Sequence, residues 1–363
     1  MQYAMKVLDT PLKWIGAIAA VVSLVLGLNQ VTRVFSELGE RQRHIAELQA
    51  VAAQQLKGSD YMAAWASLDE ALAAADQGSY FGKLSGRLDP ARLELRAAQE
   101  DVAMAWLRDA RVPDGKTFGD VVDPLMTVIT RGILGTSGAR KADLLAHLGW
   151  AYFLKSRDGA ASGNPEQAYA QALEADVANP FAHAHWGHWI LWKRGSDAEA
   201  ERHFAAAVAS GRERAYVRKL QIAALRNSGS VAAESSLLRA VDAMRRNGEE
   251  IDAATRRHVF SLYYAAFNSE QYLQRVLATL PAQEHILTIR ALYFDPDFDP
   301  ALAPLRDAML ALLQEAAGLR EDSLATWRSI VATLPPGGDA RVAELAAAAI
   351  PRLSRPVRPT DSD

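Results

Sequence analysis

Apolar residues along this chain recur at intervals of three, four and seven positions, and no stretch alternates convincingly between apolar and polar residues as a strand would. Val34, Leu38, Ile45 and Ala52, for instance, fall along one side of a helix. The intervening turns are rich in glycine, proline and aspartate. The pattern therefore predicts an all-α protein.

One stretch is apolar on every side. The run from Trp14 to Thr32 has 19 residues without a charge, and as a helix it would span about 28 Å, close to the roughly 30 Å core of a bilayer. A buried core helix should show polar positions on a solvent face, and a cleaved signal peptide should end in a small-x-small site, where this chain has LGLNQ. With these two alternatives left open, the run favours a single transmembrane helix over residues 14–32, behind a short flank at residues 1–13.

The charged residues on either side of this run indicate on which side of the membrane the rest of the chain would lie. Lysine and arginine are nearly balanced on the two sides of the run, and the short amino-terminal flank carries Lys6 and Lys13. A bias toward arginine over lysine and an abundance of alanine are typical of a GC-rich bacterial gene. We therefore expect a single-pass protein of the bacterial inner membrane, with residues 14–32 in the lipid bilayer and the bulk of the chain in the periplasm.

Two segments share a repeated helical motif. In LLAHLGWAY, residues Leu145, Leu148, Gly149 and Tyr152 match the spacing W-x2-L-G-x2-Y, with leucine in place of tryptophan. The same spacing returns in the next unit at His183, Trp186, Gly187 and Ile190, and each unit has a second helix that pairs an aromatic residue with small ones, at Tyr169 and Ala172 and then at Ala200, Phe204 and Ala207. A small residue opposite a large one lets two helices approach closely.

This motif resembles the tetratricopeptide repeat, a helix–turn–helix unit of about 34 residues. The resemblance implies an α-solenoid of about six or seven helix pairs, each stacked on the next because one pair cannot bury its apolar face alone. Two longer helices, at Pro90–Asp109 and Phe118–Ile133, diverge from the motif. The expected organisation is a juxtamembrane helix with divergent helices at 33–140, the best-matching repeats at 141–246, divergent repeats at 247–354 and a disordered tail at 355–363.

The resemblance also implies where a partner would bind. In the repeat family, alternate positions of the first helices face a concave surface that holds extended peptides. In this chain that surface is aromatic and not cationic, which speaks against a partner held by its terminal carboxylate. The alternative is that a neighbouring helix of the same chain covers these rings. The partner-binding residues expected from the family are Trp150, Phe153, Leu154, Phe181, His188, Leu191 and Trp192.

The histidines of the stretch HAHWGHWILW raise the question of a metal. Helical geometry places His185 and His188 about 60° apart and His183 roughly 140 to 160° from both, so one ion cannot bind all three. The chain has no cysteine to supply further ligands. We therefore expect neither a metal nor a cofactor.

Two other stretches only begin like ligand-binding loops. DPDFDP, at residues 295–300, starts like a calcium loop, but Pro300 occupies the glycine position and Arg306 the position of the bidentate glutamate. Asp299 as a helix cap before Pro300 explains the same residues. DGKTFGD, at residues 114–120, lacks the first glycine of a phosphate loop, because Ala110 stands there.

Charge and motif content narrow the function further. The formal net charge is −3, with 40 basic against 43 acidic residues, so nothing favours nucleic acid as a partner. No hydrolase or metalloprotease motif is present, and we expect no enzymatic activity. The sequence predicts a membrane-anchored scaffold that binds a protein or peptide partner through a concave aromatic surface. The alternative is a non-catalytic regulatory or assembly subunit of a larger membrane or cell-envelope complex.

Overall fold

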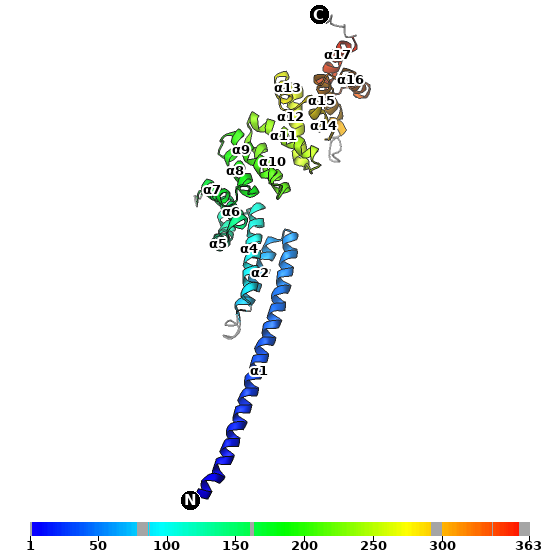
Figure 1. Ribbon diagram of the computed structural model, residues 1–363. Coiled ribbons are helices and arrows are strands. Elements are labelled where there is room, and N and C mark those ends of the chain that lie inside the picture. The colour runs from blue at the N-terminus through cyan, green and yellow to red at the C-terminus, as the bar shows by residue number, and fades with distance from the viewer. Residues whose placement is uncertain are drawn as a thin grey trace, which may run out of the picture. The chain divides into compact units, whose positions relative to one another are not determined.

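The computed structural model describes residues 2–77, 86, 88–159, 163–291, 300–335 and 337–355. Within the first helix, side chains are described from residue 22 onward, apart from Val25 and Val34. Every regular element in these ranges is a helix, so the prediction of an all-α protein is confirmed (Figure 1). The chain forms two compact units, Met1–Ala182 and His183–Asp363, and the boundary falls inside helix α8.

The first unit is built from consecutive helices, each packed on the next. Their bounds are α1 (Gln2–Lys57), α2 (Tyr61–Asp76), α4 (Asp89–Arg108), α5 (Phe118–Gly135), α6 (Gly138–Ser156) and α7 (Pro165–Ala175), followed by the start of α8 (Pro180–Trp192). The two longer helices predicted near residues 90–109 and 118–133 correspond to α4 and α5.

The second unit continues in the same manner after the end of α8. Its helices are α9 (Asp197–Ala209), α10 (Arg214–Ser228), α11 (Val231–Arg246), α12 (Ala253–Asn268), α13 (Glu270–Leu277), α14 (Ala282–Ala291), the 3-10 helix η2 (Pro300–Leu302), α15 (Ala303–Ala316), α16 (Arg320–Thr333) and α17 (Ala340–Ser354).

Within each unit the packing follows the order of the chain, as in an α-solenoid. In the first unit α1 packs on α2, α2 on α4, α4 on α5, α5 on α6 and α6 on α7. In the second, α9 and α11 both pack on α10, and α16 lies between α15 and α17. This arrangement confirms the solenoid-like part of the prediction.

The helix pairs approach closely at the glycines of the repeated motif. A Cβ on Gly149 of α6 would lie 2.4 Å from Cε1 of Tyr169 on α7, and one on Gly187 of α8 would lie 3.1 Å from Cε2 of Phe204 on α9. Tyr169 and Phe204 are both buried. The opposition of a small and a large residue expected from the sequence therefore exists in both hairpins.

Local sequence signals fix where several helices begin. Thr117 caps α5 through a reciprocal pair of bonds with Asp120, and Asn164 caps α7 just before Pro165. Asn179, which is fully buried, accepts from the backbone N–H of Ala182 at 2.9 Å. Its Nδ2 donates to Asp143 Oδ1 of α6 at 2.6 Å, so one side chain both caps α8 and joins it to α6.

The prediction of a transmembrane helix over residues 14–32 is wrong, and with it the single-pass location in a bacterial inner membrane and the bilayer as a partner. In the part of the chain that is described, no helix combines the length and the apolar character needed to cross a bilayer. Residues 14–21 lie outside the described side chains.

Two predictions concern segments outside the described residues. The loop at residues 295–300 falls almost entirely in the segment 292–299, including its proposed cap Asp299. The tail at 355–363 is described only at Arg355. Pro300 does begin a helical element, η2.

Candidate partner-binding surface

Five of the seven residues predicted to bind a partner are buried. They are Trp150, Phe153, Leu154, Phe181 and Leu191. The indole N–H of Trp150 donates to the backbone oxygen of Leu107 at 3.1 Å, and its ring lies 4.8 Å from that of Phe153. A buried tryptophan whose N–H is bonded to a neighbouring helix is part of the core. For these five residues the structure supports the alternative interpretation, in which the chain covers its own rings.

The other two predicted residues remain accessible. His188 is partly exposed, and Trp192 at the end of α8 is 53% exposed. One turn before the end of the same helix, Trp189 lies under Lys193, whose Nζ is 5.1 Å from the ring centroid. An exposed tryptophan next to a cation–π pair is a surface that a partner could cover.

Beneath the buried aromatic residues lies a neutral histidine. Nδ1 of His147 is 2.7 Å from the backbone oxygen of Asp143, so this nitrogen carries the proton, and the imidazole packs 4.6 Å from the Phe181 ring. Burial, together with the positive charge of Arg108, lowers the pKa of His147 to about 3. The arrangement stabilises the core and provides no acid or base at neutral pH.

The histidines of α8 bind neighbouring side chains separately. Nδ1 of His183 lies 3.0 Å from Nδ1 of His203, and Nε2 of His185 lies 2.8 Å from the Tyr216 hydroxyl. Burial lowers the pKa of His203 to about 4, and the nearby charges of His183 and Arg202 act in the same direction. Among the described residues, no three histidine, aspartate or glutamate side chains come close enough to hold a metal ion together.

Sequence reasoning missed an aromatic cluster formed by Tyr61, Trp65 and Trp106. The ring centroids of Tyr61 and Trp106 are 6.3 Å apart with nearly parallel planes, and those of Trp65 and Trp106 are 6.3 Å apart with an edge-to-face angle of 71°. All three residues are only partly buried. The available signal was the four-residue spacing of Tyr61 and Trp65, but Trp106 joins them only because α2 packs on α4.

Polar groups define one edge of this aromatic cluster. The hydroxyl of Tyr61 donates to Asp109 Oδ2 at 2.6 Å. Burial raises the pKa of Tyr61, and the bond to Asp109 raises it further, so the phenol stays neutral and keeps donating. The Asp60 side chain caps α2 at the residue before Tyr61, accepting from the N–H of Ala63. The Asp60 cap therefore fixes the start of α2, where the aromatic cluster begins, and the carboxylate of Asp109 orients the ring of Tyr61.

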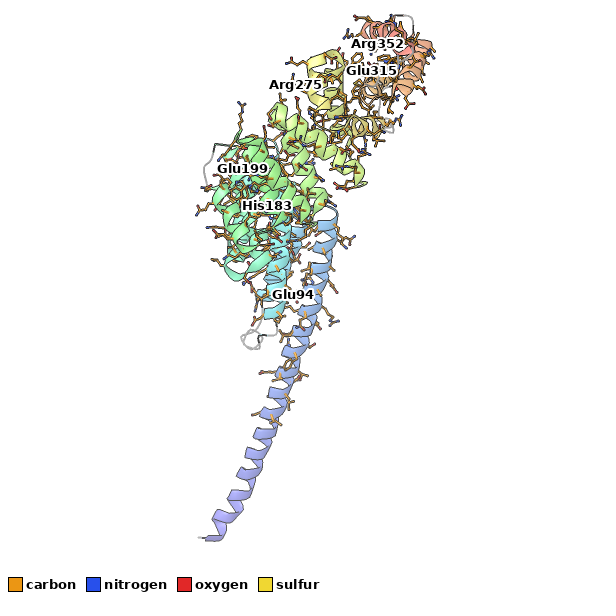
Figure 2. The ribbon with its side chains drawn as sticks, turned by 45° about the horizontal axis from the view of Figure 1, so that its top comes forward. Glu94, His183, Glu199, Arg275, Glu315 and Arg352 are labelled. Carbon is orange, nitrogen blue, oxygen red and sulfur yellow. The ribbon has the colours of Figure 1, made fainter. Side chains whose placement is uncertain are left out.

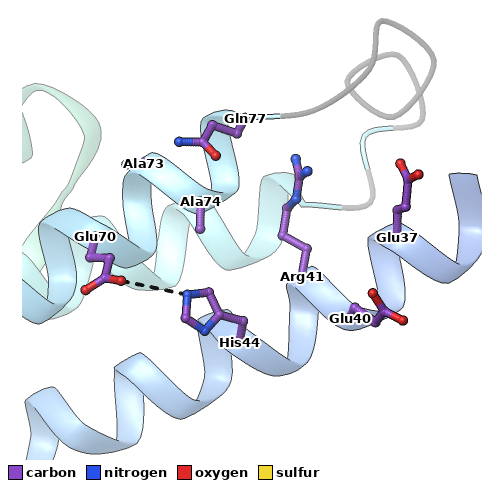
Figure 3. A pocket seen from close by; sticks show the side chains of 8 residues that line it. All are labelled: Glu37, Glu40, Arg41, His44, Glu70, Ala73, Ala74 and Gln77. Atoms are coloured by element: carbon purple, nitrogen blue, oxygen red, sulfur yellow. Dashed lines mark ion pairs between the residues drawn. The ribbon is translucent and has the colours of Figure 1, made fainter.

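A polar pocket of about 460 Å³ lies where the end of α2 meets α1 (Figure 3). It is lined by Glu37, Glu40, Arg41, His44, Glu70, Ala73, Ala74 and Gln77. Nε2 of His44 is 3.9 Å from Glu70 Oε1, and both side chains are more than half exposed, so the pair is weak. The glutamates and the single arginine form a solvated groove.

A second pocket, of about 420 Å³, lies in the other unit beside the start of α10. Its charges are internally compensated, since Glu249 pairs with both Arg214 and Arg218, at 3.4 and 3.2 Å. Arg218 also donates to Gln221 Oε1 at 2.9 Å. These bonds hold the loop after α11 against α10, which is a structural role.

No protein-family model and no curated protein matches this chain. The assignment of the repeats to the tetratricopeptide family therefore stays a prediction.

Proposed function

We propose that this protein is a non-enzymatic scaffold that binds a protein or peptide partner on the aromatic cluster of its first unit. The observation that carries the proposal is that Tyr61, Trp65 and Trp106 contact one another and yet stay partly exposed. Large rings that are held rigidly and not fully covered are the side chains most enriched at binding hot spots.

The setting of the cluster supports a binding role over a purely structural one. Trp65 packs, partly buried, against the apolar cluster that contains Ala64 and Leu68, so part of its ring is held by the core and part stays exposed. Asp109 and Arg108 lie at the edge of the cluster, and a polar rim around an aromatic centre is the usual anatomy of an interface. A stacked pair with one perpendicular ring offers faces and edges for an apolar or proline-containing segment.

The test uses peptides selected from a random displayed library against the full chain, with affinities measured by calorimetry. Trp65→Ala and Trp106→Ala should each weaken binding by about tenfold or more, because each removes part of one contact surface. Both residues are partly exposed, so the far-UV circular dichroism spectrum should be retained.

Leu93→Ala is the matched control, because Leu93 is exposed on the same helix as Trp106 but lies thirteen residues away, about 20 Å along the axis. It should leave the affinity unchanged. If peptides bind equally well to all three variants, or if none is selected by the native chain, the aromatic cluster is not the binding surface.

A further inference from the structure

The first helix carries an apolar seam that continues beyond its partner. Leu24, Leu28, Val31, Phe35 and Leu38 follow one another at intervals of four, three, four and three residues. This alternation is the heptad spacing of helices that pack side by side over a long distance. After Leu38 the same line of the helix continues at Ile45 and Ala52, each seven residues further along.

The two halves of the seam differ in what covers them. Leu38, Ile45 and Ala52 are buried in one apolar cluster with residues of α2, including Ala64 and Leu68. Toward the amino terminus, Leu24 is 65% exposed, Leu28 61% and Val31 53%. Figure 1 shows α1 continuing past the end of α2, and Figure 2 shows the side chains of this part projecting away from the helix.

The polar pocket of Figure 3 lies where α2 ceases to cover the apolar seam of α1. Ala73, Ala74 and Gln77, at the end of α2, face Glu37, Glu40 and Arg41 of α1. From this level toward the amino terminus, α2 is no longer present to pack on α1, because α2 ends at Asp76. The exposed seam is thus a direct continuation of the α1–α2 interface.

Between Asn29 and Glu37 the positions away from the seam and its flanks are polar, whereas nearer the amino terminus Val22 and Leu26 lie off the seam, are apolar and are 51% and 59% exposed. Asn29, Gln30 and Ser36 lie off the seam, and Arg33 forms an ion pair with Glu37 at 3.3 Å in which both side chains are largely exposed. A helix with one apolar line and a polar remainder is suited to packing against another helix.

The positions beside the seam favour an identical partner. In the heptad, the flanking positions between Leu24 and Gly39 hold valine, glycine and threonine, so no charged residue borders the seam there. Two copies in parallel register would bring no like charges together. Gly27 is a flanking position at which a β-carbon would meet no atom within 4 Å, so a second helix could approach closely.

We propose that residues 24–35 of α1 pair in parallel with the same residues of a second copy of this chain, forming a homodimer. The α2 helix of each copy would then cover the seam toward the carboxyl end, and the partner copy would cover it toward the amino end.

Single cysteines test the register directly, because the native chain contains none. In the full chain, Val31→Cys places a thiol in the seam and should form an intermolecular disulfide under mild oxidation. Gln30→Cys, one residue away on the polar side, is the matched control and should crosslink about tenfold less. Equal crosslinking of the two variants would overturn the proposal.

A second measurement tests the energetics of the same pairing. By sedimentation velocity, the native chain should be a dimer, and Leu28→Asp should raise its dissociation constant by about tenfold or more. Because Leu28 is exposed in the single chain, melting of the two units should be unchanged. A native chain that stays monomeric, or that binds phosphatidylcholine vesicles as a monomer through this segment, would overturn the proposal.

Discussion

At the scale of single residues, the packing of this protein depends on the absence of a side chain at particular positions. Gly149 is the clearest case, because Tyr169 of the next helix occupies the space that a β-carbon would need and is itself fully buried. Gly132 makes room in the same way for the carboxylate of Glu100, which a Cβ would approach to 2.5 Å. These glycines allow helix contacts that larger residues would prevent.

We expect Gly149→Ala to lower the free energy of unfolding by about 1 to 3 kcal/mol, because the new methyl group overpacks a buried site. Alanine normally stabilises a helix relative to glycine. A loss of stability in Gly149→Ala would therefore point to the overpacked site and not to helix propensity. Gly135→Ala, where no atom lies within 4 Å, should be neutral or stabilising by up to about 1 kcal/mol. Urea unfolding followed by circular dichroism separates the two; equal stabilisation by both would show that Tyr169 can move away.

At the scale of helices, a buried ion pair joins elements that are not hairpin partners. Arg140, in the first turn of α6, donates to Glu100 Oε2 of α4 at 2.8 Å and to the backbone oxygen of Ala97 at 3.0 Å, and it also pairs with Asp101. Glu100 is almost fully buried. A carboxylate at that depth needs its partner, because desolvation of an unpaired charge is strongly unfavourable.

We expect Arg140→Met to lower the free energy of unfolding by about 2 to 3 kcal/mol, less than a fully buried pair would lose because Arg140 is 31% exposed. Arg341→Met, which removes an exposed pair with Glu344, should change stability by about 0.5 kcal/mol or less. Adding Glu100→Gln to Arg140→Met should recover part of the loss, because it removes the unpaired charge. Chemical denaturation of the three variants measures all of these values; no recovery in the double variant would assign the loss to packing.

At the scale of the whole molecule, neutral histidines make stability depend on pH. Burial lowers the pKa of His147 to about 3 and that of His203 to about 4, and it also lowers the pKa values of His258 and His285. The unfolded chain binds protons at these sites below about pH 6.5, whereas the folded chain does not until the pH approaches the folded values. The stability that these neutral histidines give to the folded chain is therefore complete above pH 6.5. It is lost progressively as the pH falls toward 4 and 3.

Between pH 7 and pH 5 the free energy of unfolding should fall, and His147 alone should account for about 2 kcal/mol of that fall. His147→Asn retains a donor near the position of Nδ1 but cannot be protonated. Its absolute stability is expected to be lower at pH 7, yet its loss between the two pH values should be smaller by about 2 kcal/mol than that of the native chain. Urea titrations at both pH values measure the difference, and parallel losses would exclude His147 as the source.

Several features of the fold could be predicted from sequence because they depend on near neighbours in the chain. The helical spacing of apolar residues required helices, and the opposition of Gly149 to Tyr169 followed from a motif repeated at Gly187 and Phe204. The prediction of a bilayer span at 14–32 was wrong, because no helix in the described residues combines the length and the apolar character that a span needs. Trp150 misled because a helical pattern states which face a residue occupies and not what packs against that face.

By itself the sequence determined that the chain is helical and where most hairpins turn, because capping residues, glycines and apolar periodicity act within a few residues of one another. Only the tertiary structure decided which rings are covered and which are open. Phe181 is buried and Trp192 is exposed on one helix, and Trp106 meets Tyr61 across forty-five positions of chain. The exposure of a side chain depends on what packs opposite it. Contacts between residues that are far apart in the sequence are set by helix packing and not by local preference.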